Sequence, residues 1–98
     1  MKENAYQKHV KDRIESLIPG CVVLKNDPNY IQGIPDLLIL YHDKWAMLEV
    51  KRGEKEKHQP NQDYYVELFG EWAYASFIFP ENEEEVLYEL QRALGLTR

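Results

Sequence analysis

The sequence predicts a small α/β domain in which three helices pack around one sheet of four short strands. Hydrophobic residues make up 44% of the 98 positions and aromatic residues 12%, which is enough apolar surface for one modest core. Short β-rich runs alternate with segments of helical periodicity, and clusters of Gly, Pro, Asn and Asp separate them. We therefore expect a single domain over residues 1–98, with the order α-β-β-β-α-β-α.

The first half of the chain is expected to form one helix and three strands. Tyr6, Val10, Ile14 and Leu17 recur at helical spacing until Pro19-Gly20 ends the pattern. A β-rich run follows, then turn formers, then a hairpin around 42–44 whose second strand alternates poorly, as a central strand packed on both faces would. The expected elements are a helix over 4–18 and strands over 21–25, 36–41 and 45–51.

The second half is expected to contain an exposed loop, two helices and one strand. Residues 52–58 are polar, and Pro60 opens a helix that Gly70 should end as its C′ residue. Asn82 is a good N-cap, and three glutamates follow it in the first turn, where the helix dipole favours acids. The expected elements are helices over 61–69 and 83–94, a strand over 72–79 that Pro80 ends, and a buried stripe of Val86, Leu87, Leu90 and Leu94.

Composition excludes several classes of protein. The longest apolar run, residues 37–41, is far too short to cross a bilayer, and the N-terminus lacks the apolar core of a signal peptide. A lone cysteine, Cys21, allows neither an internal disulfide nor a multi-cysteine zinc site. We therefore expect a soluble, intracellular (cytoplasmic) protein with no membrane partner.

Net charge is −5, and all of it comes from residues 67–98, which carry seven acids against Arg92 and Arg98. This balance argues against indiscriminate phosphate binding, which needs clustered Lys and Arg. It leaves a nucleic-acid enzyme open, because carboxylates that hold a cation also lower the net charge.

The residues that indicate chemistry are Asp36 and, thirteen positions later, Glu49 and Lys51. With the hairpin turn near Asp43, position 36 faces 49–50 across the two strands, so the two carboxylates come within reach of one cation. Glu49 and Lys51 are two apart on one strand and leave from the same face. Such charges at the end of an apolar hairpin are costly unless paired or metal-bound. Carboxylate oxygens select Mg²⁺ or Mn²⁺ over softer metals.

This arrangement resembles the PD-(D/E)xK nuclease superfamily. More narrowly, it resembles the virus-type replication-repair nuclease (VRR-NUC) group in its short, stand-alone phage form, over about residues 3–79. Single pieces such as Glu-x-Lys are weak signals, whereas their order and spacing together are specific. The matching parts are Glu3 or Glu15 on the first helix, Gly33-Ile34-Pro35-Asp36, Glu49-Val50-Lys51, and Gln62 after Pro60.

The resemblance implies a restriction-endonuclease-like core with a small mixed sheet and a metal-dependent endonuclease that leaves a 5′-phosphate. Mg²⁺ is the implied cofactor, Mn²⁺ is expected to substitute, and no small-molecule cofactor is expected. Asp36, Glu49 and the Val50 carbonyl would hold the metal, while Lys51 would position or activate the attacking water. Gln62 would support the site from the second helix.

Either Glu3 or Glu15 could complete the metal site, and the helical period favours Glu3. Glu3 extends the buried stripe toward one end of the sheet, with Gln7 one turn later on the same face. Glu15 groups instead with Lys8 and Lys11 on a solvated flank.

The implied substrate is DNA, with a Holliday junction or a flap as the structure-selective hypothesis. A domain of this size would act on branched DNA as a homodimer. The third helix and its aromatic neighbours are candidates for the dimer interface. Three alternatives stay open: a catalytically silent nucleic-acid-binding module, a small interaction or regulatory protein that uses its acidic C-terminal face on a basic partner, and a sequence-preferring nicking or restriction nuclease on the same fold. The expected DNA-binding cations are Lys8, Lys11, Arg52, Lys55 and Lys57.

Each candidate also has an ordinary structural explanation. Asp36 could be a turn residue, Glu49 and Lys51 a surface ion pair, and Glu3 a fraying helix start. Gln62 could be an ordinary first-turn residue. His9 and His58 lack a histidine partner one turn away, so neither is expected to bind metal. The aromatic residues Tyr64, Tyr65, Trp72 and Tyr74 could stack on bases but more often belong to a core or an interface.

Overall fold

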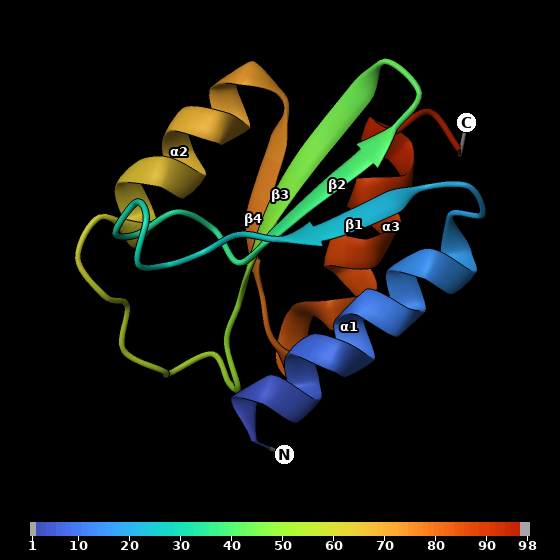
Figure 1. The fold of residues 1–98 in the computed structure, drawn as a ribbon. Helices are drawn as coiled ribbons and strands as arrows, with labels where there is room; N and C mark the ends of the chain where they lie inside the picture. Colours follow the sequence, from blue (N-terminus) through green and yellow to red (C-terminus); the bar gives the residue numbers. More distant parts are fainter. Residues whose placement is uncertain (1, 97–98) are drawn as a thin grey trace.

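The computed structural model describes residues 2–96 and confirms the expected α/β architecture. The seven predicted helices and strands are all present in the predicted order, and a short 3-10 helix precedes the last one (Figure 1). The elements are α1 (Glu3–Leu17), β1 (Val22–Lys25), β2 (Leu37–Tyr41), β3 (Lys44–Val50), α2 (Gln62–Trp72), β4 (Tyr74–Ile78), η1 (Pro80–Asn82) and α3 (Glu83–Ala93).

The four strands form one mixed sheet in the order β1-β2-β3-β4. β1 pairs with β2 and β2 with β3 in antiparallel fashion, whereas β4 lies parallel to β3. A parallel neighbour requires a crossover connection, and α2 supplies it. β3 is therefore a central strand, as its poorly alternating sequence predicted.

The helices cover the two faces of the sheet unequally. α1 and α3 lie on one side and α2 lies on the other (Figure 1). The face toward α1 and α3 carries the core, in which Ile39, Leu48 and Ile78 are completely buried together with Val10, Ile14 and Leu90 of the two helices. On the other face, α2 covers only β3 and β4. No helix among residues 2–96 covers β1 and β2 on that side of the sheet.

Two predictions around α2 and β4 are wrong. Gly70 does not end α2 as a C′ residue, because the helix continues through it to Trp72, and Trp72 belongs to the helix rather than to the following strand. The reason is aromatic packing: the extra turn brings the Trp72 ring to 5.5 Å from the Phe69 ring. A terminal glycine is a local preference that such tertiary contacts override.

Asn82 also differs from its expected role. It is the N-cap residue of α3, but its side chain makes no capping bond to that helix. Instead it accepts a hydrogen bond from the Phe79 N–H at 2.9 Å and donates to the Phe77 carbonyl at 3.1 Å. The short helix η1 begins at Pro80, directly before α3. The Asn82 side chain therefore bonds to the backbone at the start of η1 and does not cap α3.

No helix among residues 2–96 combines the length and the apolar character needed to cross a membrane.

Candidate active site

The hairpin of β2 and β3 sets the two candidate carboxylates side by side. Leu37 pairs with Leu48, so Asp36 and Glu49 occupy the next position along the two strands. The Val50 N–H donates a hydrogen bond to Asp36 Oδ2 at 2.9 Å, which fixes the Asp36 side chain against the end of β3. The spacing that predicted this approach from the sequence is confirmed.

Asp36 is held from the other side by the loop that precedes it. Asn26 donates from its backbone N–H to the Asp36 carbonyl and from its side chain to the Pro35 carbonyl, both at 2.8 Å. Gly33 has a φ of +91°, and a Cβ at this position would lie 2.6 Å from the Asn61 Cβ at the start of α2. Only glycine combines that conformation with so close an approach, which explains the glycine of the Gly-Ile-Pro-Asp motif.

Glu49 is almost completely buried and only half satisfied. Its side chain accepts one hydrogen bond, from Gln62 Nε2 to Oε2 at 2.9 Å, and Lys51 Nζ lies 3.8 Å from the same oxygen. The other oxygen, Oε1, is buried and has no hydrogen-bond partner among the residues that the structure describes. Leaving a buried carboxylate oxygen without a partner costs roughly 1–3 kcal/mol. An ordinary structural ion pair would not be built this way.

Lys51 is also buried, with 5% of its surface exposed. Its backbone N–H bonds to the Ile78 carbonyl at 2.9 Å, which extends the pairing with β4 by one residue. Its ammonium group donates to the Lys57 carbonyl at 3.2 Å. Glu49 and Lys51 therefore share one face of the strand, as predicted, and are not the exposed surface pair that was the alternative explanation.

Gln62 is positioned by the turn before α2. The Gln59 N–H donates to Gln62 Oε1 at 2.8 Å, which leaves the Gln62 amide nitrogen facing Glu49. Sequence reasoning identified Gln62 but missed Gln59 and the Lys57 carbonyl. Both act through backbone atoms, and backbone groups leave no residue-type signal in a sequence.

Burial raises the pKa of both carboxyl groups, and the Asp36 charge adds to the rise for Glu49. Desolvation is the main cause for Asp36, and the hydrogen bond from the Val50 N–H only partly offsets it. Desolvation, with the nearby Asp36 charge as the second cause, raises the pKa of Glu49 to about 8. Two carboxylates in this position stay ionised together only when a positive charge comes between them.

These side chains line an open pocket of about 460 Å³. Its walls come from segments far apart in the sequence: the start of α1, the loop before β2, the end of β3, the loop after it and the start of α2. We call it the catalytic pocket. It is lined by Glu3, Pro28, Asp36, Glu49, Lys51, Arg52, Glu56, Lys57, Gln59 and Gln62.

The structure separates the two candidate acids of α1. Glu3 lines the catalytic pocket, whereas Glu15 is exposed and pairs with Lys11 at 2.9 Å. Within residues 2–96, however, no three His, Cys, Asp or Glu side chains are close enough together to hold one metal ion. Asp36 and Glu49 are thus the close pair, and Glu3 lies in the wall of the same pocket.

The residues present suit a divalent cation. The unpartnered Glu49 Oε1 and the adjacent Asp36 carboxylate are hard oxygen donors, the kind that Mg²⁺ and Mn²⁺ prefer. The Val50 carbonyl belongs to the residue between Glu49 and Lys51, so it is the backbone oxygen nearest in sequence to this pair. A cation here would relieve both the unpaired oxygen and the repulsion between the carboxylates.

The five cations expected to contact DNA are largely paired with acids of their own segments. Lys8 pairs with Asp12 and Lys11 with Glu15 along α1, and neither lysine lines the catalytic pocket. Arg52 pairs with Glu56, whereas Lys57 lines the pocket and Lys55 is exposed on the same loop.

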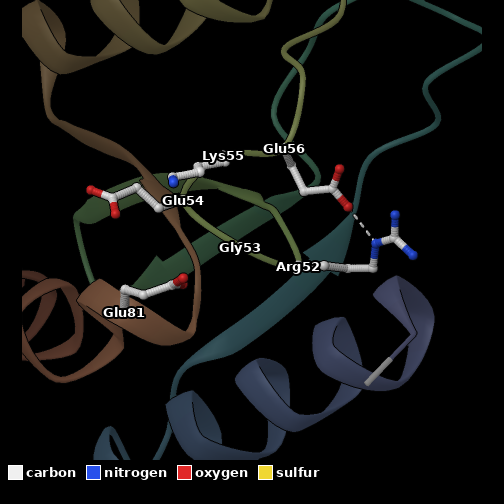
Figure 2. A pocket seen from close by; sticks show the side chains of 6 residues that line it. All are labelled: Arg52, Gly53, Glu54, Lys55, Glu56 and Glu81. Carbon is white, nitrogen blue, oxygen red and sulfur yellow. Dashed lines mark hydrogen bonds and ion pairs between the residues drawn. The ribbon is translucent and has the colours of Figure 1, made fainter.

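Figure 2 shows a second pocket, of about 470 Å³, beside this loop. The guanidinium of Arg52 is turned toward Glu56, and Glu54 and Glu81 complete an acidic wall around Lys55. The three carboxylates outnumber the two cations, Arg52 and Lys55, so the charge of this second pocket is slightly negative and weakens its attraction for phosphate.

His9 and His58, the two histidines weighed as metal ligands, and most of the candidate base-stacking aromatic residues have structural partners. His58 stacks on Phe77 with 4.1 Å between ring centres and contacts Asp63, while His9 contacts Glu83. Tyr65 stacks on Phe69 of α2, and Trp72 contacts the same ring edge to face. Tyr64 and Trp72 nevertheless remain exposed over more than half of their surface.

Comparison with solved structures agrees with this geometry. One chain described as a VRR-NUC domain has 29% sequence identity and a TM-score of 0.69, covering 88% of this chain and 94% of its own. Another, described as a VRR-NUC domain protein, has 17% identity and a TM-score of 0.67, covering 98% and 90%, and shows the fold alone. No family model matches the sequence, and no curated protein matches it. The fold, the arrangement of Asp36, Glu49 and Lys51, and the first of these neighbours support a VRR-NUC domain.

Proposed function

We propose that this protein is a Mg²⁺-dependent DNA endonuclease that hydrolyses phosphodiester bonds. The observation that supports this most directly is the convergence of Asp36, Glu49 and Lys51 on one open pocket, with one Glu49 oxygen buried and unpartnered. The likeness to VRR-NUC domains favours a nuclease of that superfamily. Mn²⁺ should replace Mg²⁺, because both accept the same hard oxygen ligands.

Asp36 and Glu49 would bind the cation together with the Val50 carbonyl, and Glu3, which lies in the pocket wall but not within reach of the same ion, would act on it through a bound water. A bound divalent cation polarises a phosphodiester and lowers the pKa of a coordinated water. The Val50 N–H already orients Asp36, and Gln62 orients Glu49 while leaving Oε1 free. The ligand pair is therefore set in place by the fold before any ion binds.

Lys51 would position and so help to activate the attacking water, and its ammonium would stabilise negative charge on the phosphate. Among the described residues its ammonium group donates one hydrogen bond, to the Lys57 carbonyl, and lies 3.8 Å from Glu49 Oε2. An ammonium has three donors, so further donors remain for a water or a phosphate oxygen. Burial beside Glu49 fixes the direction in which it presents them.

Branched DNA, a Holliday junction or a flap, is the substrate that the charge distribution favours. Affinity for ordinary duplex grows with the number of unpaired cations that meet phosphates. Here Lys8, Lys11 and Arg52 are already paired with acids. Weak general affinity leaves recognition to the shape of the substrate rather than to its phosphate charge.

A homodimer would supply two sites for paired nicks, and the open face of β1 and β2 is its best-supported interface. Val22, Leu24 and Leu40 are 51%, 45% and 36% exposed there, opposite the buried Val23 and Ile39. The stripe of α3, the helix first considered for this role, is buried in the core and leaves Tyr88 as the exposed large apolar side chain among its described residues. Leu24→Lys should therefore dissociate the dimer in analytical ultracentrifugation, whereas Tyr88→Ala should not.

Nuclease activity can be tested with labelled four-way junction, flap and matched linear duplex, each with Mg²⁺, Mn²⁺ or EDTA. Metal-dependent cutting of the branched DNA, abolished in Asp36→Ala and Lys51→Ala, is expected. Glu15→Ala is a matched control, since this acid lies on the exposed flank of α1 and should leave cutting unchanged, while Glu3→Ala should reduce it.

The other outcomes distinguish the alternatives. Equal cutting of linear duplex and branched DNA would contradict structure selectivity but keep the nuclease, and a fixed position of cutting in linear DNA would favour a sequence-preferring enzyme. Binding without cutting by folded protein, with either metal, would favour a catalytically silent binding module.

A further inference from the structure

The loop between β1 and β2 carries the most exposed aromatic side chain described, directly beside the catalytic pocket. Tyr30 is 85% exposed, and its neighbour Ile31 is 39% exposed. Pro28, two residues before Tyr30, lines the catalytic pocket itself. The mechanism outlined above gives Tyr30 and Ile31 no role, and neither contributes to the core.

The loop is held rigidly despite this exposure. The Asp27 carboxylate accepts a hydrogen bond from the Asn29 N–H at 2.8 Å. The backbone carbonyl of Asp27 accepts another from the Tyr30 N–H at 3.2 Å. Gly33 packs against the start of α2, so the far end of the loop is fixed to the helix that carries Gln62 (Figure 1). A side chain displayed on a fixed loop loses little entropy when it binds a partner.

Tyr30 also forms one wall of a small pocket of about 240 Å³, which has room for a single heteroaromatic ring system. Ile31 and Ile34 make this pocket mostly apolar, and Asn26 and Asp27 form its polar edge. The Asp27 carboxylate repels phosphate, but it can accept a hydrogen bond from the amino group of a base. The lining therefore suits a nucleobase and excludes a phosphate.

We propose that Tyr30 and this pocket bind one unstacked base of the DNA next to the bond that is cut. The proposal rests on the proposed nuclease function for its substrate and adds a cause for structure selectivity. A base inside an ordinary duplex is stacked on both sides and cannot enter, whereas an unpaired base at a branch, bulge or single-stranded end can. Stacking on an aromatic side chain is tolerant of sequence, so the preference would be for structure.

The test is binding of the full chain to two DNAs in EDTA, where metal-dependent cutting cannot interfere. One is a duplex with a three-nucleotide bulge that contains 2-aminopurine, whose fluorescence falls on stacking; the other is the fully paired duplex. Wild type should prefer the bulged DNA and quench its fluorescence. Tyr30→Ala should bind the bulged DNA about tenfold more weakly, from the usual contribution of one stacked base, and lose the quenching.

Two further variants keep this test specific. Tyr30→Trp retains a stacking ring and should retain both signals, and Tyr88→Ala removes a half-exposed tyrosine on α3 and should change neither. The proposal is overturned when Tyr30→Ala binds and quenches like wild type, or when it weakens both DNAs equally.

The same DNAs incubated with Mg²⁺ separate this proposal from the nuclease function. Tyr30-dependent binding and quenching without any cutting by wild type would support the base-binding site and contradict the nuclease. The opposite result is cutting that requires Asp36 while Tyr30→Ala still prefers the bulged DNA as wild type does. That result would support the nuclease and contradict the base-binding site.

Discussion

Two buried carboxylates in this molecule have very different surroundings. Glu83, at the start of α3, is met by three side chains of α1: the Tyr6 hydroxyl at 2.8 Å, Arg13 at 2.8 Å and His9 at 2.9 Å. Glu49, at the end of β3, receives one hydrogen bond and keeps an oxygen without a partner. The same fold satisfies one acid completely and leaves the other with an unpartnered oxygen, although Lys51 lies 3.8 Å from its second oxygen.

The pKa values move in opposite directions as a result. Burial acts to raise the pKa of Glu83, but hydrogen bonds from Arg13, His9 and Tyr6 together outweigh it and lower the value. Burial and the Asp36 charge act in the same direction on Glu49 and raise its pKa to about 8. Glu83 thus holds α1 against α3, whereas Glu49 imposes a cost on folding of the kind found at functional sites.

The largest expected difference between the two acids is in catalysis. Glu49→Gln keeps the shape of the side chain but removes the charge that would hold the metal, so DNA cleavage should fall by about 10²-fold or more. Lys51→Ala should cost about 10²–10⁴-fold, the range for a lost proton-transfer or charge-stabilising group. Initial rates on branched DNA with saturating Mg²⁺ measure both.

Glu83→Gln is the matched control for catalysis, because it makes the same chemical change in the satisfied cluster. It should leave the rate unchanged at temperatures where the variant is folded. A loss of activity as large as that of Glu49→Gln would mean that the two clusters are coupled, and the functional distinction between them would fail.

The next largest difference is in metal binding measured without DNA. A ligand that binds only the folded state stabilises it by about 2.7 kcal/mol at about 100 times its Kd. Mg²⁺ or Mn²⁺ should therefore raise the melting temperature of wild type and of Glu83→Gln, but not of Glu49→Gln or Asp36→Asn. Equal stabilisation of all four proteins by the cation would place the metal elsewhere.

For folding stability, Glu83 should matter more than Glu49, which reverses the order expected for catalysis and metal binding. Glu83→Ala leaves Tyr6, His9 and Arg13 without their common acceptor at a largely buried position, and the free energy of unfolding should fall by about 2 kcal/mol. Glu84→Ala removes an acid that is 80% exposed and also contacts Arg13, and it should cost less than about 1 kcal/mol. Urea unfolding near neutral pH measures both changes.

The sequence predicts those features of the structure that depend on interactions between neighbouring segments of the chain. Element order, the hairpin register and the convergence of Asp36, Glu49 and Lys51 follow from period and spacing along neighbouring segments. The choice of Glu3 over Glu15 follows from helical period in the same way, and Glu3 does line the catalytic pocket.

Interactions between distant segments were not predictable from the sequence. The Glu83 cluster joins residues 70 or more positions apart, and three glutamates in a first helical turn look alike until one of them is buried. The extension of α2 beyond Gly70 depends on Trp72 packing on Phe69. The base pocket around Tyr30 depends on how a loop without periodicity folds back on itself.

The smallest expected effect is the dependence of folding stability on pH. It compares the two acids most directly, because stability should change with pH in opposite directions for Glu49 and Glu83. The folded-state pKa of Glu49 lies above its ordinary value of 4.5, so its contribution to stability is full below about pH 4.5 and is lost as the pH rises toward 8. In EDTA, wild type should therefore lose stability over this range relative to Glu49→Gln. The gap should reach about 1 kcal/mol near pH 8, since water in the open pocket relieves part of the penalty.

Glu83 should produce the opposite slope at the acidic end. Its folded-state pKa is lowered, so its contribution is present above the ordinary glutamate pKa and is lost as the pH falls through the folded value. Urea unfolding of wild type, Glu49→Gln and Glu83→Gln from pH 3 to pH 8 in EDTA measures both slopes. If Glu49→Gln is no more stable than wild type at pH 8, Glu49 has a partner in solution, and the main argument for a cation at this position is lost.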